Sequence, residues 1–255
     1  MYRFCISLLF VGITSFTFAQ NSAQEKDTVS RKYAYGLRVG VDLSRPVFAF
    51  LRDNYTGLEL TGDFRLTERW WLAAELGNEE RTQEENLEQN TLYTYTASGS
   101  YIKLGGDYNT YTNWYGMRNQ IHIGGRYAFS TFSQTLENFR FFDSNRFFSP
   151  DEFVLGSNES QEFSSLNASW LEFVIGMKAE VIKNIYVGMS ARLAHLITNK
   201  EADNFNNLWI PGFNKVTEDS KWGVGFNYTI SYFLPLYKKV KKKDPETAPV
   251  PENSN

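Results

Sequence analysis

The sequence predicts an all-β fold, a closed antiparallel up-and-down barrel of eight transmembrane strands. Three observations predict it: eight segments alternate apolar with small or polar residues, short and long connections alternate, and aromatic residues gather at segment ends. A β-strand directs successive side chains to opposite faces, so each segment has one apolar and one polar face. An even number of strands is typical of bacterial membrane barrels.

The clearest segment lies near the C-terminus. Its apolar residues occupy every second position: Trp222, Val224, Phe226, Tyr228, Ile230, Tyr232 and Leu234. The intervening positions from 223 to 231 hold Gly, Asn, Thr or Ser. This alternation is longer than in most globular strands and matches the roughly 9–11 residues of a tilted membrane-spanning strand.

The same pattern recurs earlier in the chain, with charged residues on the polar face. In order, the seven further predicted strands are 33–43, 58–66, 70–77, 102–108, 115–129, 171–180 and 187–194. Aromatic residues near their ends suit the two interfaces of a bilayer.

The connections between these segments divide into two classes. The short ones are 67–69, 109–113 and 183–184, and the long ones are 44–54, 79–98, 135–167 and 199–220. Several long loops are unusual in a compact soluble domain but typical of outer-membrane barrels, whose periplasmic turns are short. If the N-terminus is periplasmic, every long loop lies outside the cell.

Composition excludes two other classes of protein. Aromatic residues make up 16% of the chain, yet mean hydropathy is −0.41 and no run of 18 apolar residues occurs after the first segment, which excludes a helical membrane protein. A net charge of −3 without a basic stripe predicts no nucleic-acid partner.

The sequence predicts four regions. Residues 1–19 read as a secretory signal peptide, 20–31 as a flexible periplasmic lead-in, 32–237 as the barrel, and 238–255 as a basic and then Pro-rich periplasmic tail. The one cysteine, Cys5, would leave with the signal peptide, so the mature chain would have no thiol chemistry. We expect export to the bacterial outer membrane.

A soluble exported, lipocalin-like barrel that binds a small apolar ligand is the alternative from pattern alone. It would turn the apolar faces inward and the charges outward. The one-sided long loops and the aromatic strand ends favour the membrane barrel.

Three stretches resemble a known family: 35–43, 101–108 and the final strand, where 221–228 is similar to the signal read by the barrel-assembly machinery. Residues 32–237 resemble the small outer-membrane β-barrels of Bacteroidota, most closely a family described only as a domain of unknown function. The resemblance implies the barrel-assembly machinery as a partner during biogenesis and supplies no activity.

We predict no catalytic residues, no metal and no cofactor. Acyl transfer or hydrolysis needs a nucleophile beside an oriented base, and neither His122 nor His195 has such a neighbour in sequence. A barrel enzyme acting on lipid A or phospholipid remains the alternative function.

The polar faces instead predict a lumen filled by ion pairs, because buried charges are costly unless they are paired. The predicted network comprises Arg38, Asp42, Glu59, Asp63, Arg65, Glu75, Lys103, Asp107, Arg118, His122, Arg126, Glu172, Lys178, Glu180 and Arg192.

Any role beyond membrane structure is expected in the outer loops. Outer-membrane lipid and lipopolysaccharide are the expected partners, together with an unidentified surface ligand. The predicted interaction surface comprises Phe139, Phe141, Phe142, Phe147, Phe148, Phe153, Trp209 and Phe213.

Overall fold

The computed structural model describes residues 32–87, 90–112, 118–143, 152–157, 159–202, 205–216 and 220–240. The predicted signal peptide, the lead-in and most of the tail lie outside these ranges. Residues 33–239 form one compact unit, and the fold described below is that of this unit.

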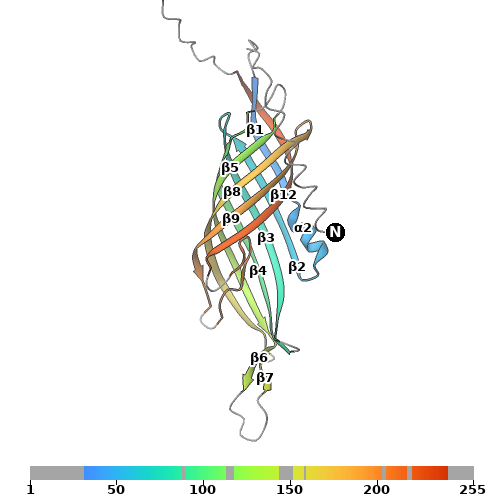
Figure 1. Ribbon diagram of the computed structural model, residues 1–255, viewed down its shortest axis with the longest axis vertical. Coiled ribbons are helices and arrows are strands. Elements are labelled where there is room, and N and C mark those ends of the chain that lie inside the picture. Colours follow the sequence, from blue (N-terminus) through green and yellow to red (C-terminus); the bar gives the residue numbers. More distant parts are fainter. Residues whose placement is uncertain are drawn as a thin grey trace, which may run out of the picture. The chain divides into compact units, whose positions relative to one another are not determined.

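Eight long strands close into a barrel, as the alternation predicts (Figure 1). They are β1 (Lys32–Asp42), β2 (Tyr55–Arg65), β3 (Trp70–Leu87), β4 (Asn90–Asn109), β5 (Gln120–Glu137), β8 (Gln161–Ile182), β9 (Ile185–Lys200) and β12 (Trp222–Val240). Their order around the ring is β1-β12-β9-β8-β5-β4-β3-β2, so the first strand lies next to the last. The predicted fold class is confirmed.

The smaller elements all belong to the long connections. Helix α2 (Ser44–Leu51) follows β1, and Pro46 in its first turn suits a helix start. The hairpin β6–β7 (Phe139–Asp143, Glu152–Ser157) joins β5 to β8. A second small hairpin, β10–β11 (Trp209–Ile210, Asn214–Lys215), joins β9 to β12. Within the described ranges, no helix has the length and apolar character to cross a bilayer.

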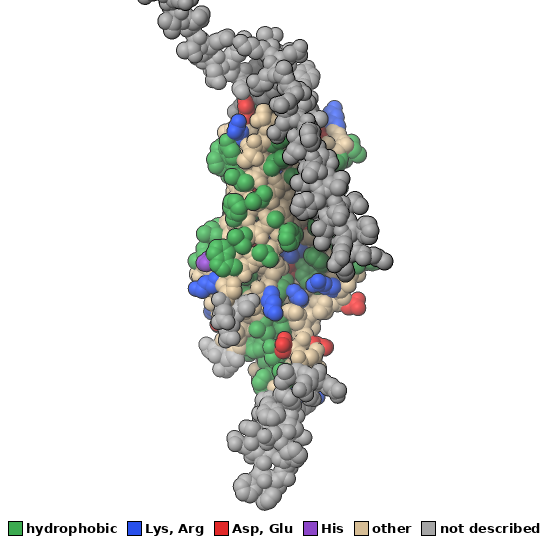
Figure 2. Space-filling view, in the orientation of Figure 1, with side chains coloured by type: hydrophobic (Ala, Val, Ile, Leu, Met, Phe, Trp, Pro, Cys, Tyr) green, Lys and Arg blue, Asp and Glu red, His purple; other side chains and the backbone are tan. Residues whose placement is uncertain are grey.

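The barrel wall has its apolar face outside. Leu104 and Phe173 are 52% and 50% exposed, whereas Arg38 and Lys103 are each 1% exposed. Figure 2 shows the hydrophobic side chains spread over the outer surface of the strands. A soluble, lipocalin-like barrel would have its apolar face inside and its charged face outside. That alternative is therefore wrong for the described barrel.

Three connections differ from the sequence prediction. The stretch 135–167, expected as a loop, contains the β6–β7 hairpin, and β8 begins within it at Gln161. Within the stretch 79–98, expected as a loop, residues 79–87 and 90–98 are strand. β3 and β4 remain paired with each other as far as Leu87 and Asn90. The Thr and Tyr residues of this stretch favour extended backbone, and the many glutamates obscured that signal. Conversely, β4 ends at Asn109 and β5 begins at Gln120, so the expected turn at 109–113 is a longer connection. β12 also continues through Val240, past the predicted start of the tail at residue 238.

Candidate functional site

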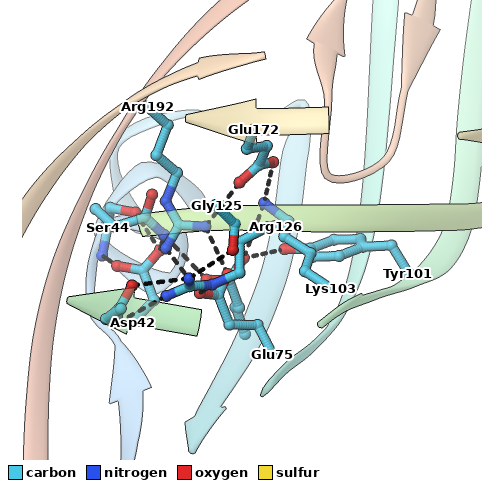
Figure 3. A network of polar contacts seen from close by, with 12 residues as sticks. Asp42, Ser44, Glu75, Tyr101, Lys103, Gly125, Arg126, Glu172 and Arg192 are labelled. Atoms are coloured by element: carbon cyan, nitrogen blue, oxygen red, sulfur yellow. Dashed lines mark hydrogen bonds and ion pairs between the residues drawn. The ribbon is translucent and has the colours of Figure 1, made fainter. Parts of the chain in front are cut away.

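The inward positions of the eight strands form a densely packed polar interior. At its centre, the Arg192 guanidinium lies between two carboxylates, 2.5 Å from Glu75 and 3.0 Å from Glu172 (Figure 3). Arg126 makes a bidentate contact with Asp107, at 2.8 and 3.0 Å, and reaches Glu75 at 3.3 Å. Planar guanidinium groups suit such shared, two-oxygen pairing. The pairs therefore link β9, β3, β8, β5 and β4 across the barrel.

A second group of polar contacts lies between these pairs and the end of the barrel that carries the long connections, which we call the outer end. The Lys103 ammonium is 2.9 Å from Glu172. The Tyr101 hydroxyl donates to Glu59 at 2.6 Å and to Glu79 at 3.1 Å. Asn227 of β12 also donates to Glu59, at 3.0 Å. Each of these carboxylates thus has a hydrogen-bond donor in the interior, as a buried anion requires.

The opposite end of the lumen is closed by aromatic rings and a further ion pair. Arg38 is 2.7 Å from Asp63, which also pairs with Lys178. The same guanidinium lies over the rings of Trp71 and Tyr186, at 4.6 and 4.9 Å from their centroids. Cation–π contact adds to the electrostatic stabilisation of a desolvated guanidinium.

Very little free space remains at mid-lumen. A cavity of about 20 Å³ lies among Asp63, Glu75, His122, Arg126 and Arg192. This is room for about one water molecule. The arrangement leaves no room for a solute at this level.

Three predicted members of the network differ from the rest. Arg118 is 43% exposed at its side chain and 3.9 Å from Glu180, so it lies at the surface instead of in the lumen. Arg65 donates to the carbonyl oxygens of Thr67, Ala34 and Glu68. His122 is buried, but its Nε2 is 3.8 Å from Asp107, which is too long for a hydrogen bond.

Glu180, the partner of Arg118, is a fourth exception: it is only partly buried and accepts from the Asn184 amide at 2.8 Å. The remaining predicted members lie in the interior and make the contacts described, including Asp42, which accepts from Asn227 at 2.7 Å. Sequence reasoning missed Arg45, which enters the interior from α2 and lies 2.9 Å from Glu79. A residue in a connection shows no alternation, so no pattern marked it. Tyr101, just before the predicted strand 102–108, and Gln120, on the polar face of the strand 115–129, also contact the network but were not predicted as members.

The segment 209–213 closes the outer end of the barrel. Trp209, Ile210 and Phe213 are 1%, 0% and 3% exposed. Phe213 packs edge-on against Trp170, with ring centroids 5.6 Å apart. The prediction that Trp209 and Phe213 form part of an exposed surface is therefore wrong. We call residues 209–213 the plug.

Gly212 allows the plug to approach the wall. Its φ is +83°, and an added Cβ would lie 2.6 Å from the Tyr101 ring. Its amide donates to Glu79 at 3.1 Å. A side chain here would be strained by both the backbone conformation and the contact.

We expect Gly212→Ala to destabilise the barrel by about 1–3 kcal/mol, because the plug must move away from Tyr101. Urea unfolding in detergent, followed by tryptophan fluorescence, measures this change. Gly62→Ala is the matched control, since a Cβ there meets nothing closer than 3.9 Å. Equal stability of the two variants would contradict the role of Gly212.

The remaining predicted surface residues lie in or near β6 and β7. Phe139 is 41% exposed. Phe141, Phe142 and Phe153 fall within the two strands, where the backbone alone is described, and Phe147 and Phe148 lie outside the described residues. Among described residues, no cluster of three or more His, Cys, Asp or Glu is placed to hold a metal ion. His195 packs against the Trp222 ring at 4.5 Å.

Comparison with known proteins finds one matching family model and several solved structures of low sequence identity. A family model described as a domain of unknown function (DUF6048) matches residues 1–239. No curated protein matches the chain.

Solved structures similar to the chain include three outer-membrane or surface proteins. The attachment invasion locus protein Ail of Yersinia pestis is 8% identical, with 80% of this chain and 99% of that chain covered and a TM-score of 0.38. CarO of Acinetobacter baumannii is 12% identical, with 79% and 98% covered and a TM-score of 0.39. A major outer membrane protein from Thermus thermophilus has the same four values.

Proposed function

The chain belongs to the family described as a domain of unknown function (DUF6048), and we propose from its geometry that it is a sealed integral barrel of the bacterial outer membrane. In this proposal the barrel does not conduct solutes and serves the envelope as a structural protein that contacts partners through its external loops. The outward apolar wall supports the membrane location, because such a surface is stable only against lipid.

The observation that carries the sealed barrel is that described side chains occupy the lumen at both ends and in the middle. Aromatic rings and the Arg38–Asp63 pair occupy one end, the pairs around Glu75 occupy the middle, and the plug occupies the outer end. Eight strands leave an interior only just wide enough for side chains, and here those side chains are large. An ion crossing the lumen would have to displace several pairs at once, and each pair is held in a low dielectric.

The surface role is the second part of the proposal. It rests on exposed apolar side chains near the long connections, including Phe139 beside β6 and Phe50 of α2, which are 41% and 89% exposed. Exposed aromatic residues beside loops are suited to lipid headgroups, lipopolysaccharide or a partner protein.

Conductance in a planar lipid bilayer tests the sealed barrel. We expect the purified, folded protein to give no current steps above the background of detergent alone. Folding is checked in the same sample by gel mobility, since a detergent-resistant barrel changes mobility after boiling. A general porin in the same bilayer is the positive control. Regular current steps from the folded protein would overturn the proposal.

A further inference from the structure

The seam between the first and last strands is incomplete at its outer end. β1 ends at Asp42, and the backbone contact with β12 there runs from the Leu43 amide to the Tyr228 carbonyl at 2.6 Å. β12 continues outward from Tyr228 to Trp222, while the chain after β1 turns into α2. β2 likewise extends beyond its last partner in β1, since Asp42 pairs with Glu59 and β2 begins at Tyr55. Residues 222–227 and 55–58 therefore flank a place where the wall lacks a strand.

A cavity of about 340 Å³ occupies this place. Val224, Phe226 and Tyr228 line it with side chains that point outward from β12 and are 67%, 65% and 53% exposed. Tyr55 and Trp209 also line it, yet they are 7% and 1% exposed and belong to the interior. Because side chains from both sides of the wall meet in one cavity, the cavity joins the lipid-facing surface to the outer end of the lumen.

The cavity is positively charged. Arg45, Arg52 and Arg81 line it, and Arg45 pairs with Glu79. No carboxylate of the described residues forms an ion pair with Arg52 or Arg81. These two guanidinium groups lie over aromatic rings instead. The Cζ of Arg52 is 5.3 Å from the centroid of the Phe48 ring, and the Cζ of Arg81 is 5.9 Å from that of Trp209. Two guanidinium groups beside an apolar surface suit an anion with several oxygens.

A buried donor at the same place lacks an acceptor. The indole Nε1 of Trp209 is buried and has no hydrogen-bond partner among the residues that the structure describes. Buried polar groups of folded proteins almost always have a partner, and a buried donor without one is costly. Because Trp209 lines the cavity, an acceptor bound there is a candidate partner for this N–H.

We propose that the seam cavity binds the phosphate group of a membrane lipid from the outer leaflet. Arg52 and Arg81 hold the phosphate oxygens, and the acyl chains lie along Val224, Phe226 and Tyr228 on the outside of β12. The apolar side of the cavity favours a lipid over free phosphate, because inorganic phosphate has nothing to place against these exposed side chains. The bound lipid would complete the wall where β1 ends.

Native mass spectrometry of the intact protein, released from detergent, tests this proposal with three probes: phosphatidic acid, the diacylglycerol with the same acyl chains, and inorganic phosphate. We expect saturable binding of phosphatidic acid, about tenfold weaker binding of diacylglycerol, and no competition from inorganic phosphate at the same concentration.

The double variant Arg52→Gln/Arg81→Gln should bind phosphatidic acid about tenfold more weakly or worse. Arg69→Gln is the matched control, because Arg69 is also exposed at the barrel rim and donates to the Tyr108 hydroxyl, away from the seam. Boiled and unboiled gel mobility shows that each variant is folded.

Three results would overturn the proposal: equal binding of diacylglycerol and phosphatidic acid, unchanged binding by the folded double variant, or full competition by inorganic phosphate. The last would assign the cavity to a free anion. None of these results bears on conductance, so the sealed barrel and the lipid site are tested separately.

Discussion

Arg192→Met should destabilise the barrel by about 3–5 kcal/mol, the loss typical of removing one partner from a buried ion pair. Arg192 is 9% exposed and contacts both Glu75 and Glu172. Methionine is of similar length and apolar, so the change leaves two carboxylates in the interior with one cation fewer. Chemical unfolding in lipid vesicles or detergent, followed by tryptophan fluorescence, measures the change.

Arg118→Met is the control for this variant. Arg118 has the same side chain, but it is 43% exposed and its nearest carboxylate oxygen, on Glu180, is 3.9 Å away. Exposed pairs contribute roughly 0–1 kcal/mol, so the control should unfold close to the wild-type midpoint. If the two variants lose the same stability, the interior pairs are not the buried network that the distances indicate.

Leu104→Arg should cost about 2–4 kcal/mol in a lipid bilayer, as expected for a cation on the lipid face near the midplane. Leu104 is 52% exposed and lies in the middle of the outward apolar positions of β4. The guanidinium would have to reach an interface or bring water into the hydrocarbon. Equilibrium folding into phospholipid vesicles measures the cost.

Thr131→Arg is the matched comparison for Leu104→Arg. Thr131 also lies on an outward position, in β5, where the apolar run of Tyr127 and Phe129 has ended. A cation near the interface costs only about 0–1 kcal/mol. Unchanged folding of Leu104→Arg would mean that the outward face of β4 does not contact lipid.

The sequence predicts the wall of this barrel well, because a period of two assigns each residue to a face. Arg38 and Val39 are neighbours in sequence, yet one is 1% and the other 45% exposed, as alternation requires. The pattern alone does not determine which face points inward; the one-sided long loops and the aromatic strand ends favour the membrane barrel.

The outer end of the barrel could not be predicted in the same way. The plug and Arg45 lie in connections, where no periodicity marks which side chains turn inward. Trp209 and Phe213 looked like exposed loop aromatics, but their burial depends on Gly212, whose positive φ and contact with Tyr101 are properties of the folded chain. The extension of β3 and β4 was hidden by glutamates, which are poor strand formers.

The cross-lumen pairs also constrain the order in which the barrel can form. Arg192 and Glu75 are 117 residues apart, and Lys178 and Asp63 are 115 apart. No single hairpin contains both partners of either pair. Arg192 and Asp63 each have a second partner within their own hairpin, Glu172 and Arg38, so the pairs across the lumen add to contacts that a hairpin can already make. Contacts between distant residues slow folding, since a long loop must close before they form. The contacts of Arg192 with Glu75 and of Lys178 with Asp63 therefore form only when strands from distant parts of the chain come together.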